Sequence, residues 1–244
     1  QGTARVDSEE QLRAALEHLP PSPEHPLLIE EFITGEEHSF ETLSLDGRLV
    51  FHSLTRYYPS ALEVLTVPWV QWRVVLPREV DAPEYDDIRE AAFRALEVLG
   101  MQTGMSHMEW FRRRDGSIAI SEVAARPPGA QFTTLIARAH DVDIHHAWAR
   151  LMILGLFEPF PRRYAAGIAF LRGMGRGHVV AVHGLDTVQR ELGALVTDAK
   201  IPAPGQPSSD GYEGEGYVIV RHPETAVVEQ ALHTIISVVR VELR

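Results

Sequence analysis

Two short segments with alternating apolar residues, Met108–Arg112 and Ser117–Val123, flank the dipeptide Asp115-Gly116. An aspartate–glycine pair between such segments is a strong signal for a β-hairpin. A hairpin fixes which residues of its two strands lie side by side. Glu109 lies six residues before Asp115 and Glu122 six residues after Gly116. A two-residue turn therefore predicts that the two glutamates pair directly on one face.

The paired glutamates indicate a cation site. Two carboxylates held this close repel each other unless a cation or a proton lies between them. Mg²⁺ prefers one or two carboxylates, with its other oxygens from phosphates or water, and Arg126 just beyond the second strand adds a planar cation suited to phosphate. The alternative is a hairpin whose charges face solvent. Apolar neighbours such as Trp110 and Ile120 favour the cation site, because an unpaired carboxylate among them is costly.

The composition excludes several classes of function. The chain has 244 residues, 45% hydrophobic and 23% charged, which is ordinary for a globular protein. A net charge of −11 and the lack of a basic block make nucleic acid and anionic membranes poor partners. With no cysteine, thiolate metal sites and thiol nucleophiles are excluded. No apolar run could span a bilayer and no signal peptide is visible, so we expect a cytoplasmic protein.

Periodic patterns predict an α+β fold. Helices are expected at Glu9–Leu19 after a Ser8 cap, Asp86–Leu99, Ala130–Ala139, Ile144–Leu154 and Pro223–Val239. Besides the hairpin, strands are expected at Leu27–Phe32, Glu37–Ser44, Leu49–Thr55, Gly167–Leu171, His178–Val182, Thr197–Lys200 and Gly216–Arg221. Residues 57–72, rich in aromatics and proline, predict an ordered loop over a site. Prolines 159 and 161 predict a boundary between a first domain, 1–163, and a small C-terminal α+β domain, 164–244.

With the hairpin placed, the chain resembles the ATP-grasp superfamily of carboxylate–amine ligases over nearly its whole length. The second motif that carries the resemblance is Ile29-Glu30-Glu31-Phe32-Ile33-Thr34-Gly35-Glu36-Glu37, at about the expected distance before the hairpin. In this family such a segment joins two lobes that clasp the nucleotide. The resemblance implies that Glu30 and the backbone at Glu31 and Ile33 face adenine, and that Glu37 binds the ribose hydroxyls.

The resemblance also assigns roles around the hairpin. Each strand of the family's hairpin carries one metal-binding glutamate, followed by an Asn-x-Arg pattern. Glu109, Glu122 and Arg126 match, whereas Ala124 stands where many members have asparagine. The resemblance therefore implies that Glu109 and Glu122 bind Mg²⁺, with a second magnesium one protein ligand short. It makes Arg126 the catalytic cation and places Arg56 near a phosphate contact.

The chain opens in the middle of a motif, with Gln1 in place of methionine, so we expect a fragment. The lobe with the family's phosphate-binding lysine and glycine-rich loop would precede it. The implied fold is a partial ATP-grasp domain with a mixed or antiparallel sheet. The segment from Glu122 to Gly129 and the tail from Ala165, with Arg176-Gly177-His178, look most like the L-amino-acid ligase and carnosine-synthase-like branch.

The activity implied by the resemblance is an ATP-dependent ligation. The enzyme would use ATP and Mg²⁺ to join a carboxylate and an amine, such as two amino acids, through an acyl phosphate, releasing ADP and phosphate. Its partners would be these small molecules and, in a homodimer, a second copy. Two alternatives stay open. One is a biotin-carboxylase-like carboxylase, which bicarbonate-dependent ATP turnover would reveal; the other is an inert fragment or a subunit that needs a partner.

Overall fold

The computed structural model describes residues 4–67 and 70–244. The chain divides into two compact units, one up to Thr34 and one from Gly35 onwards. In the first unit the predicted helix is confirmed as α1 (Glu9–His18). The Ser8 side chain accepts a hydrogen bond from Gln11 N, which satisfies one of the free N–H groups at the start of the helix.

The predicted buried strand Leu27–Phe32 is wrong. These residues have no regular secondary structure, and Leu28 and Ile29 are 81% and 61% exposed. A strand needs a neighbouring strand to pair its backbone N–H and C=O groups. Helix α1 is the only helix or strand that the structure describes in this unit, so the apolar run finds no strand partner there.

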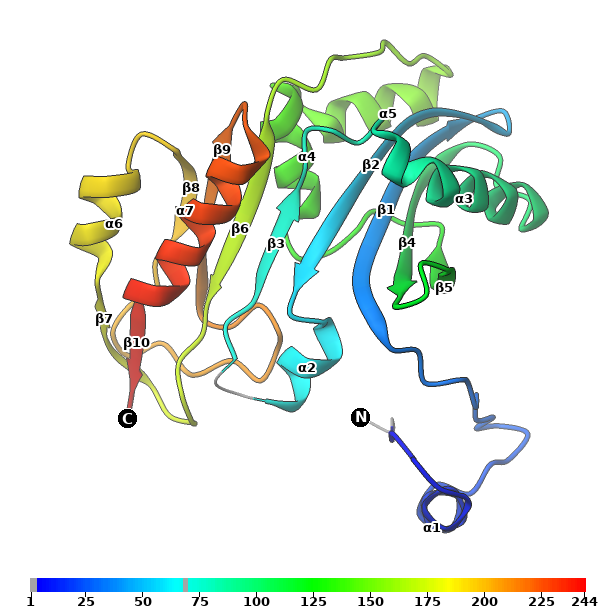
Figure 1. Ribbon diagram of the computed structural model, residues 1–244, viewed down its shortest axis with the longest axis horizontal. Coiled ribbons are helices and arrows are strands. Elements are labelled where there is room, and N and C mark those ends of the chain that lie inside the picture. Colours follow the sequence, from blue (N-terminus) through cyan, green and yellow to red (C-terminus); the bar gives the residue numbers. More distant parts are fainter. Residues whose placement is uncertain (1–3, 68–69) are drawn as a thin grey trace. The chain divides into compact units, whose positions relative to one another are not determined.

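The second unit, in its described residues, is built on an eight-stranded sheet in the order β5-β4-β1-β2-β3-β6-β9-β8 (Figure 1). All neighbouring strands are antiparallel. The strands are β1 (Gly35–Leu45), β2 (Arg48–Tyr58), β3 (Arg73–Leu76), β4 (Gly104–Arg113), β5 (Ile118–Ala124), β6 (Ala165–Leu171), β8 (Val196–Lys200) and β9 (Gly216–His222). A small separate sheet pairs β7 (Val179–His183) with β10 (Arg240–Leu243).

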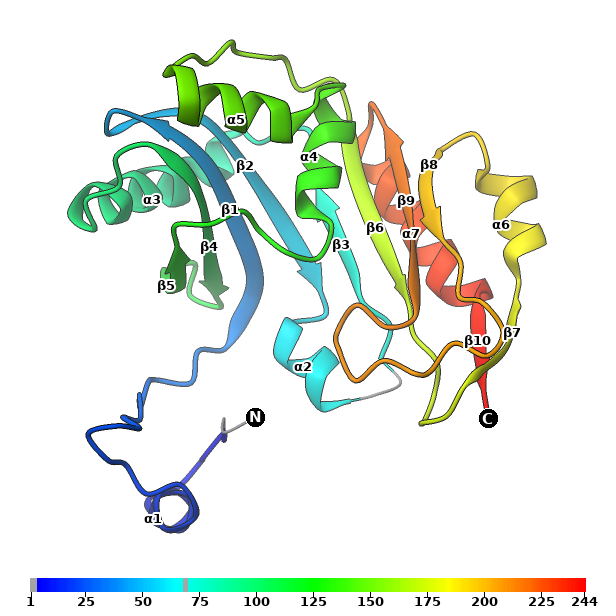
Figure 2. The ribbon, with the colours of Figure 1, turned by 180° about the vertical axis from the view of Figure 1, so that it is seen from behind.

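Helices cover both faces of the large sheet (Figures 1 and 2). Helices α4 and α5 pack on one face, here called the α4 face, in a core that includes Phe132 and Trp72. Helices α3 and α7 pack on the other, the α3 face, where Ile88 shares a core with Trp110 and Leu232 shares one with Val75. The helices are α2 (Ala61–Thr66), η1 (Pro83–Tyr85), α3 (Asp86–Val98), α4 (Phe132–His140), α5 (Ile144–Leu154), α6 (Leu185–Leu192) and α7 (Thr225–Val238).

The predicted α+β class is confirmed, and the sheet is antiparallel throughout. Sequence patterns missed β3, β10 and α6, and residues 57–72, predicted as a loop, contain α2; residues 68 and 69 of that loop lie outside the described part. Strand β6 follows the predicted 163/164 boundary directly and pairs with β3, so residues 164–244 continue the sheet of the preceding ones. None of the described helices has the length and apolar character needed to cross a membrane.

Candidate functional site

Glu109 on β4 and Glu122 on β5 are direct cross-strand neighbours, which confirms the predicted pairing. The turn is longer than predicted, because three residues separate the backbone-paired Arg113 and Ser117. A bulge beside Glu109, in which Ser121 is the extra residue, then shifts the register back by one position. The two irregularities cancel, and both carboxylates project from the same face.

The surroundings of the two carboxylates differ. The Glu109 side chain is 28% exposed; its Oε1 accepts a hydrogen bond from Tyr57 OH at 3.5 Å and lies 3.6 Å from His107 Nε2. The Glu122 side chain is 55% exposed, with Oε1 3.6 Å from an Arg126 guanidinium nitrogen. The apolar setting expected from the sequence is therefore wrong for Glu122, because β5 is an edge strand of the sheet.

The donor set around this pair fits a cation that arrives with a phosphate. Within residues 4–67 and 70–244, no group of three or more His, Asp or Glu side chains could hold a metal ion by itself. Glu109 and Glu122 offer two carboxylates, and Mg²⁺ commonly takes one or two of these and completes its shell with phosphate oxygens and water. Ala124, opposite His107 in the register, adds no ligand.

Polar residues continue inward from Glu109 along the α4 face: His107, which the strand alternation places on the same face as Glu109, and three residues of β1 and β2 that sequence reasoning did not find. Ser39, Glu41 and Ser53 are fully buried. His107 Nδ1 lies 3.0 Å from Glu41 Oε1. Burial by itself would lower the pKa of His107, but the nearby carboxylates of Glu109 and Glu41 outweigh burial and raise the pKa to about 9. Alternation in β1 gives no signal for Ser39 and Glu41, because residues 36, 38 and 42 are polar as well.

Glu37 on β1 also belongs to this face, and its carboxylate lies at the start of helix α2. Its Oε2 accepts a hydrogen bond from Ala61 N at 2.6 Å, a favourable position for a carboxylate at a helix N-terminus. Burial raises the pKa of Glu37 to about 7; the Ala61 hydrogen bond opposes the increase and nearby Glu109 adds to it. The ribose contact of Glu37 stays a prediction. So do the adenine contacts of Glu30, Glu31 and Ile33, which belong to the first unit.

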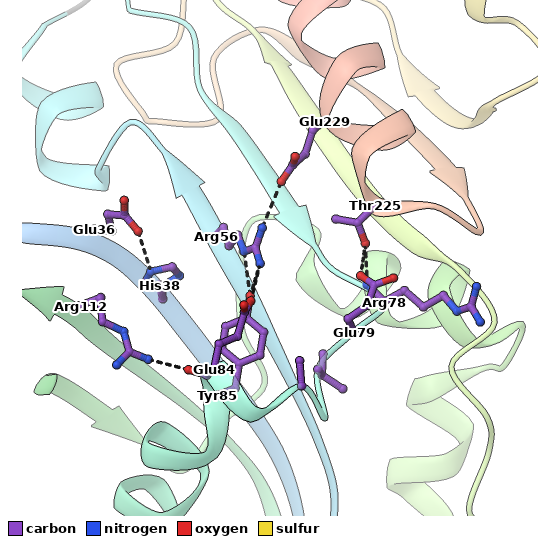
Figure 3. A network of polar contacts seen from close by, with 12 residues as sticks. Glu36, His38, Arg56, Arg78, Glu79, Glu84, Tyr85, Arg112, Thr225 and Glu229 are labelled. Atoms are coloured by element: carbon purple, nitrogen blue, oxygen red, sulfur yellow. Dashed lines mark hydrogen bonds and ion pairs between the residues drawn. The ribbon is translucent and has the colours of Figure 1, made fainter. Parts of the chain in front are cut away.

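Arg56 lies on the opposite side of the sheet from the paired glutamates. Neighbouring Tyr57 points toward Glu109, and alternation along a strand turns Arg56 to the α3 face. There its guanidinium donates to Tyr85 OH at 2.9 Å, Glu229 at 3.2 Å and Glu84 at 3.2 Å, tying β2 to η1 and α7 (Figure 3). The structure thus places Arg56 on the α3 face, and the phosphate contact that the resemblance implies for it stays a prediction.

We expect Arg56→Met to lower the free energy of unfolding by about 1–2 kcal/mol, because it removes the hydrogen bonds of a partly buried guanidinium to Tyr85 and Glu229. The matched change Arg126→Met, at a side chain 52% exposed, should alter stability by less than about 0.5 kcal/mol. Urea unfolding of the chain measures both. If Arg56→Met leaves stability unchanged while weakening nucleotide binding in the full-length protein, the phosphate role implied by the resemblance is correct instead.

Arg126 and the turn after it border the paired glutamates. Arg126 donates to Pro127 O at 3.1 Å, and Ala130 and Gln131 both adopt positive φ, +49° and +63°, conformations rare outside glycine. A Cβ on Gly129 would lie 3.6 Å from Tyr212 OH. Tyr212, in the segment between β8 and β9, therefore packs next to this turn. Sequence reasoning missed Tyr212, which no motif singled out.

Comparison with known proteins agrees with this arrangement. The family model described as "D-ala D-ala ligase C-terminus" matches residues 1–142. An L-arginine-specific L-amino acid ligase of Bacillus subtilis is 24% identical over 118 residues, which are 48% of this chain and 28% of the relative. The chain therefore aligns with less than a third of that relative's length.

Solved structures show the same fold. An L-amino acid ligase from Bacillus licheniformis superimposes with a TM-score of 0.75 at 19% identity, covering 98% of this chain and 61% of that one. An N5-carboxyaminoimidazole ribonucleotide synthetase from Thermotoga maritima gives 0.63 at 16% identity, with 88% and 55% covered. The family match extends over more than half of the chain. The chain therefore belongs to the D-Ala–D-Ala ligase C-terminal family, within the ATP-grasp superfamily of carboxylate–amine ligases.

Proposed function

We propose that this chain carries the metal and phosphoryl-transfer side of an ATP-dependent ligase that joins two amino acids, forming ADP. The observation that supports this most is the pairing of Glu109 with Glu122 on one face of the sheet. The guanidinium of Arg126 lies 3.6 Å from Glu122 Oε1. The named activity of the Bacillus subtilis relative, an L-amino acid ligase, supports the substrate class.

The proposed reaction needs little covalent help from the protein. A carboxylate oxygen of the first substrate attacks the γ-phosphorus of ATP, and ADP leaves. The amine of the second substrate then attacks the carbonyl carbon of the acyl phosphate, loses a proton, and expels inorganic phosphate as the amide forms. Both steps concentrate negative charge on phosphoryl oxygens, so the protein contributes by positioning and by neutralising that charge.

Each site residue has a role in this scheme. When bound, Mg²⁺ would supply positive charge between the phosphates, held by Glu109 and Glu122. Arg126, half-exposed beside Glu122, would donate hydrogen bonds to the transferred phosphoryl group. The strained turn at Ala130 and Gln131 would shape the end of the site where the substrates lie.

ADP release by the full-length protein, screened over pairs of amino acids, tests the proposal. We expect ADP formation that requires both an amino-acid carboxylate and an amine, with a dipeptide detectable by mass spectrometry. The likeness to N5-carboxyaminoimidazole ribonucleotide synthetases supports a carboxylase as the second candidate. ADP formation that depends on bicarbonate and not on a second amino acid would favour it and overturn the ligase proposal.

The isolated 244-residue chain should bind Mg-ATP weakly and form no ADP. Affinity for a triphosphate comes largely from cationic and backbone contacts to its phosphates. On the paired-glutamate face the chain offers Arg126, which already contacts Glu122. Isothermal calorimetry with Mg-ATP measures this, with the full-length protein as the reference. Comparable affinity of the two proteins would mean that the nucleotide is held mainly by the residues described here.

A further inference from the structure

Glu41 has no role in the proposed reaction, yet it is a carboxylate with no exposed surface in the middle of the sheet. Removing a charged group from water is expensive unless other groups compensate. In the strand register Glu41 on β1 lies between His107 on β4 and Ser53 on β2. All three belong to the α4 face, and His107 and Ser53 are buried as well.

Only one of the two carboxylate oxygens of Glu41 has a hydrogen-bond partner among the described residues. Its Oε1 lies 3.0 Å from His107 Nδ1, whereas its Oε2 is buried without a hydrogen-bond partner in the described parts of the chain. The guanidinium of Arg162 donates to Ser53 Oγ and Pro77 O, each at 2.9 Å, and is attracted electrostatically by Glu41. The Glu41 carboxylate therefore has the imidazole of His107 as its hydrogen-bond partner and the guanidinium of Arg162, bound to Ser53, as an electrostatic one.

This arrangement fixes the imidazole of His107. The ring nitrogen Nδ1 faces Glu41, and the imidazole packs against the Phe132 ring in an edge-to-face arrangement with centroids 6.1 Å apart. The other nitrogen, Nε2, consequently points toward Glu109 Oε1 at 3.6 Å. One oxygen of the Glu109 carboxylate is thereby held by His107 and Tyr57, and the geometry leaves the second oxygen for another partner.

We propose that Glu41 is a positioning residue for the metal-binding carboxylate Glu109, and that it acts through His107. The proposal rests on the proposed function, because it gives Glu109 the role of a Mg²⁺ ligand. Groups that hydrogen-bond a ligating carboxylate orient it before the metal arrives, and removing them typically weakens metal binding by about 10- to 100-fold. Glu41 contacts the ligating carboxylate only through His107, so we expect an effect near the lower end of that range.

The test compares two variants of Glu41 in the full-length protein. Glu41→Met keeps most of the volume and removes the acceptor for His107; Glu41→Gln keeps an acceptor and removes the charge. We expect the Mg²⁺ concentration for half-maximal ADP formation to rise about tenfold for Glu41→Met and less for Glu41→Gln. The kcat at saturating Mg²⁺ should change little, since Glu41 does not touch the reacting groups.

Thr42→Val is the matched control. Thr42 is the next residue on β1, is equally buried, and shares a hydrogen bond with Ser106 on β4, but it faces away from His107. Its replacement should leave the Mg²⁺ requirement unchanged. If Thr42→Val raises that requirement as much as Glu41→Met does, the effect is a general loosening of the strand pair and the proposal fails.

Crystal structures of the 244-residue chain and its Glu41→Gln variant provide a measurement that does not depend on catalysis or on the folding of Glu41→Met. We expect the distance from His107 Nε2 to Glu109 Oε1 to lengthen, or to vary between copies, in the variant. If both this distance and the Mg²⁺ requirement are unchanged in Glu41→Gln, the positioning role of Glu41 is wrong, while the proposed metal site is unaffected. If Glu109→Gln also leaves the Mg²⁺ requirement unchanged, the proposed metal site itself is wrong.

Discussion

Glu122→Gln in the full-length protein should reduce ADP formation by about 10²–10³-fold while the protein stays folded. Glutamine keeps the shape of glutamate but cannot supply the negative charge that would hold Mg²⁺ in the proposed site. Removing one well-placed electrostatic contact to the charge of a transition state typically costs this much in rate. The Glu122 side chain is 55% exposed on an edge strand, so its replacement should not disturb the core.

The measurement is the initial rate of ADP release at saturating ATP and Mg²⁺, with circular dichroism as the test of folding. Glu90→Gln on α3, an exposed glutamate on the opposite face, makes the same change of charge and should keep full activity. Glu109→Gln should resemble Glu122→Gln, because the two carboxylates would share one cation in the proposed site. A Glu122→Gln protein with most of its activity would remove Glu122 from the metal site, and would leave Glu109 and Arg126 to be tested separately.

The hairpin shows how far local patterns reach. The Glu109–Glu122 pairing was predicted because alternation and a turn signal act over a few residues. The three-residue turn and the bulge at Ser121 were not, since an aspartate–glycine pair fits turns of either length and the alternation of β5 does not mark the extra residue. Helix α5 was predicted with its observed ends, Ile144 and Leu154, because the Asp143 cap and Gly155 mark them locally.

The failures have a common physical origin in contacts between distant segments. Leu27–Phe32 carries an apolar run typical of a strand, but the described residues of its unit, 4–34, contain no strand that could pair with it. Glu41 looks like any other glutamate in the sequence; only the packing of three strands reveals that it is buried next to His107. The surroundings of Arg56 likewise come from distant segments, since its partners Glu84, Tyr85 and Glu229 belong to η1 and α7, and its phosphate contact stays a prediction.

Glu37→Gln should make the protein more stable at neutral and alkaline pH relative to the wild type. In the folded chain the pKa of Glu37 is about 7, against 4.5 for an unburied glutamate. A group whose pKa is raised by folding contributes stability that is fully present below pH 4.5 and is lost as the pH rises through about 7. Between pH 5 and pH 8 the wild type should lose roughly 2–3 kcal/mol that the glutamine variant keeps, since each pKa unit corresponds to about 1.4 kcal/mol.

Urea unfolding of both proteins at pH 5 and pH 8 measures this difference. Glutamine keeps an oxygen that can accept the hydrogen bond from Ala61 N, so the variant removes the ionisation and little else. Glu36→Gln is the control: the Glu36 side chain is 84% exposed, and its replacement should give the same stability difference at both pH values. An equally flat result for Glu37→Gln would mean that the folded chain keeps Glu37 hydrated. The variant can also be tested for ATP binding in the full-length protein. A stability gain at pH 8 together with weaker ATP binding would support the ribose contact, because the carboxylate that destabilises the fold would then be one that binds the nucleotide.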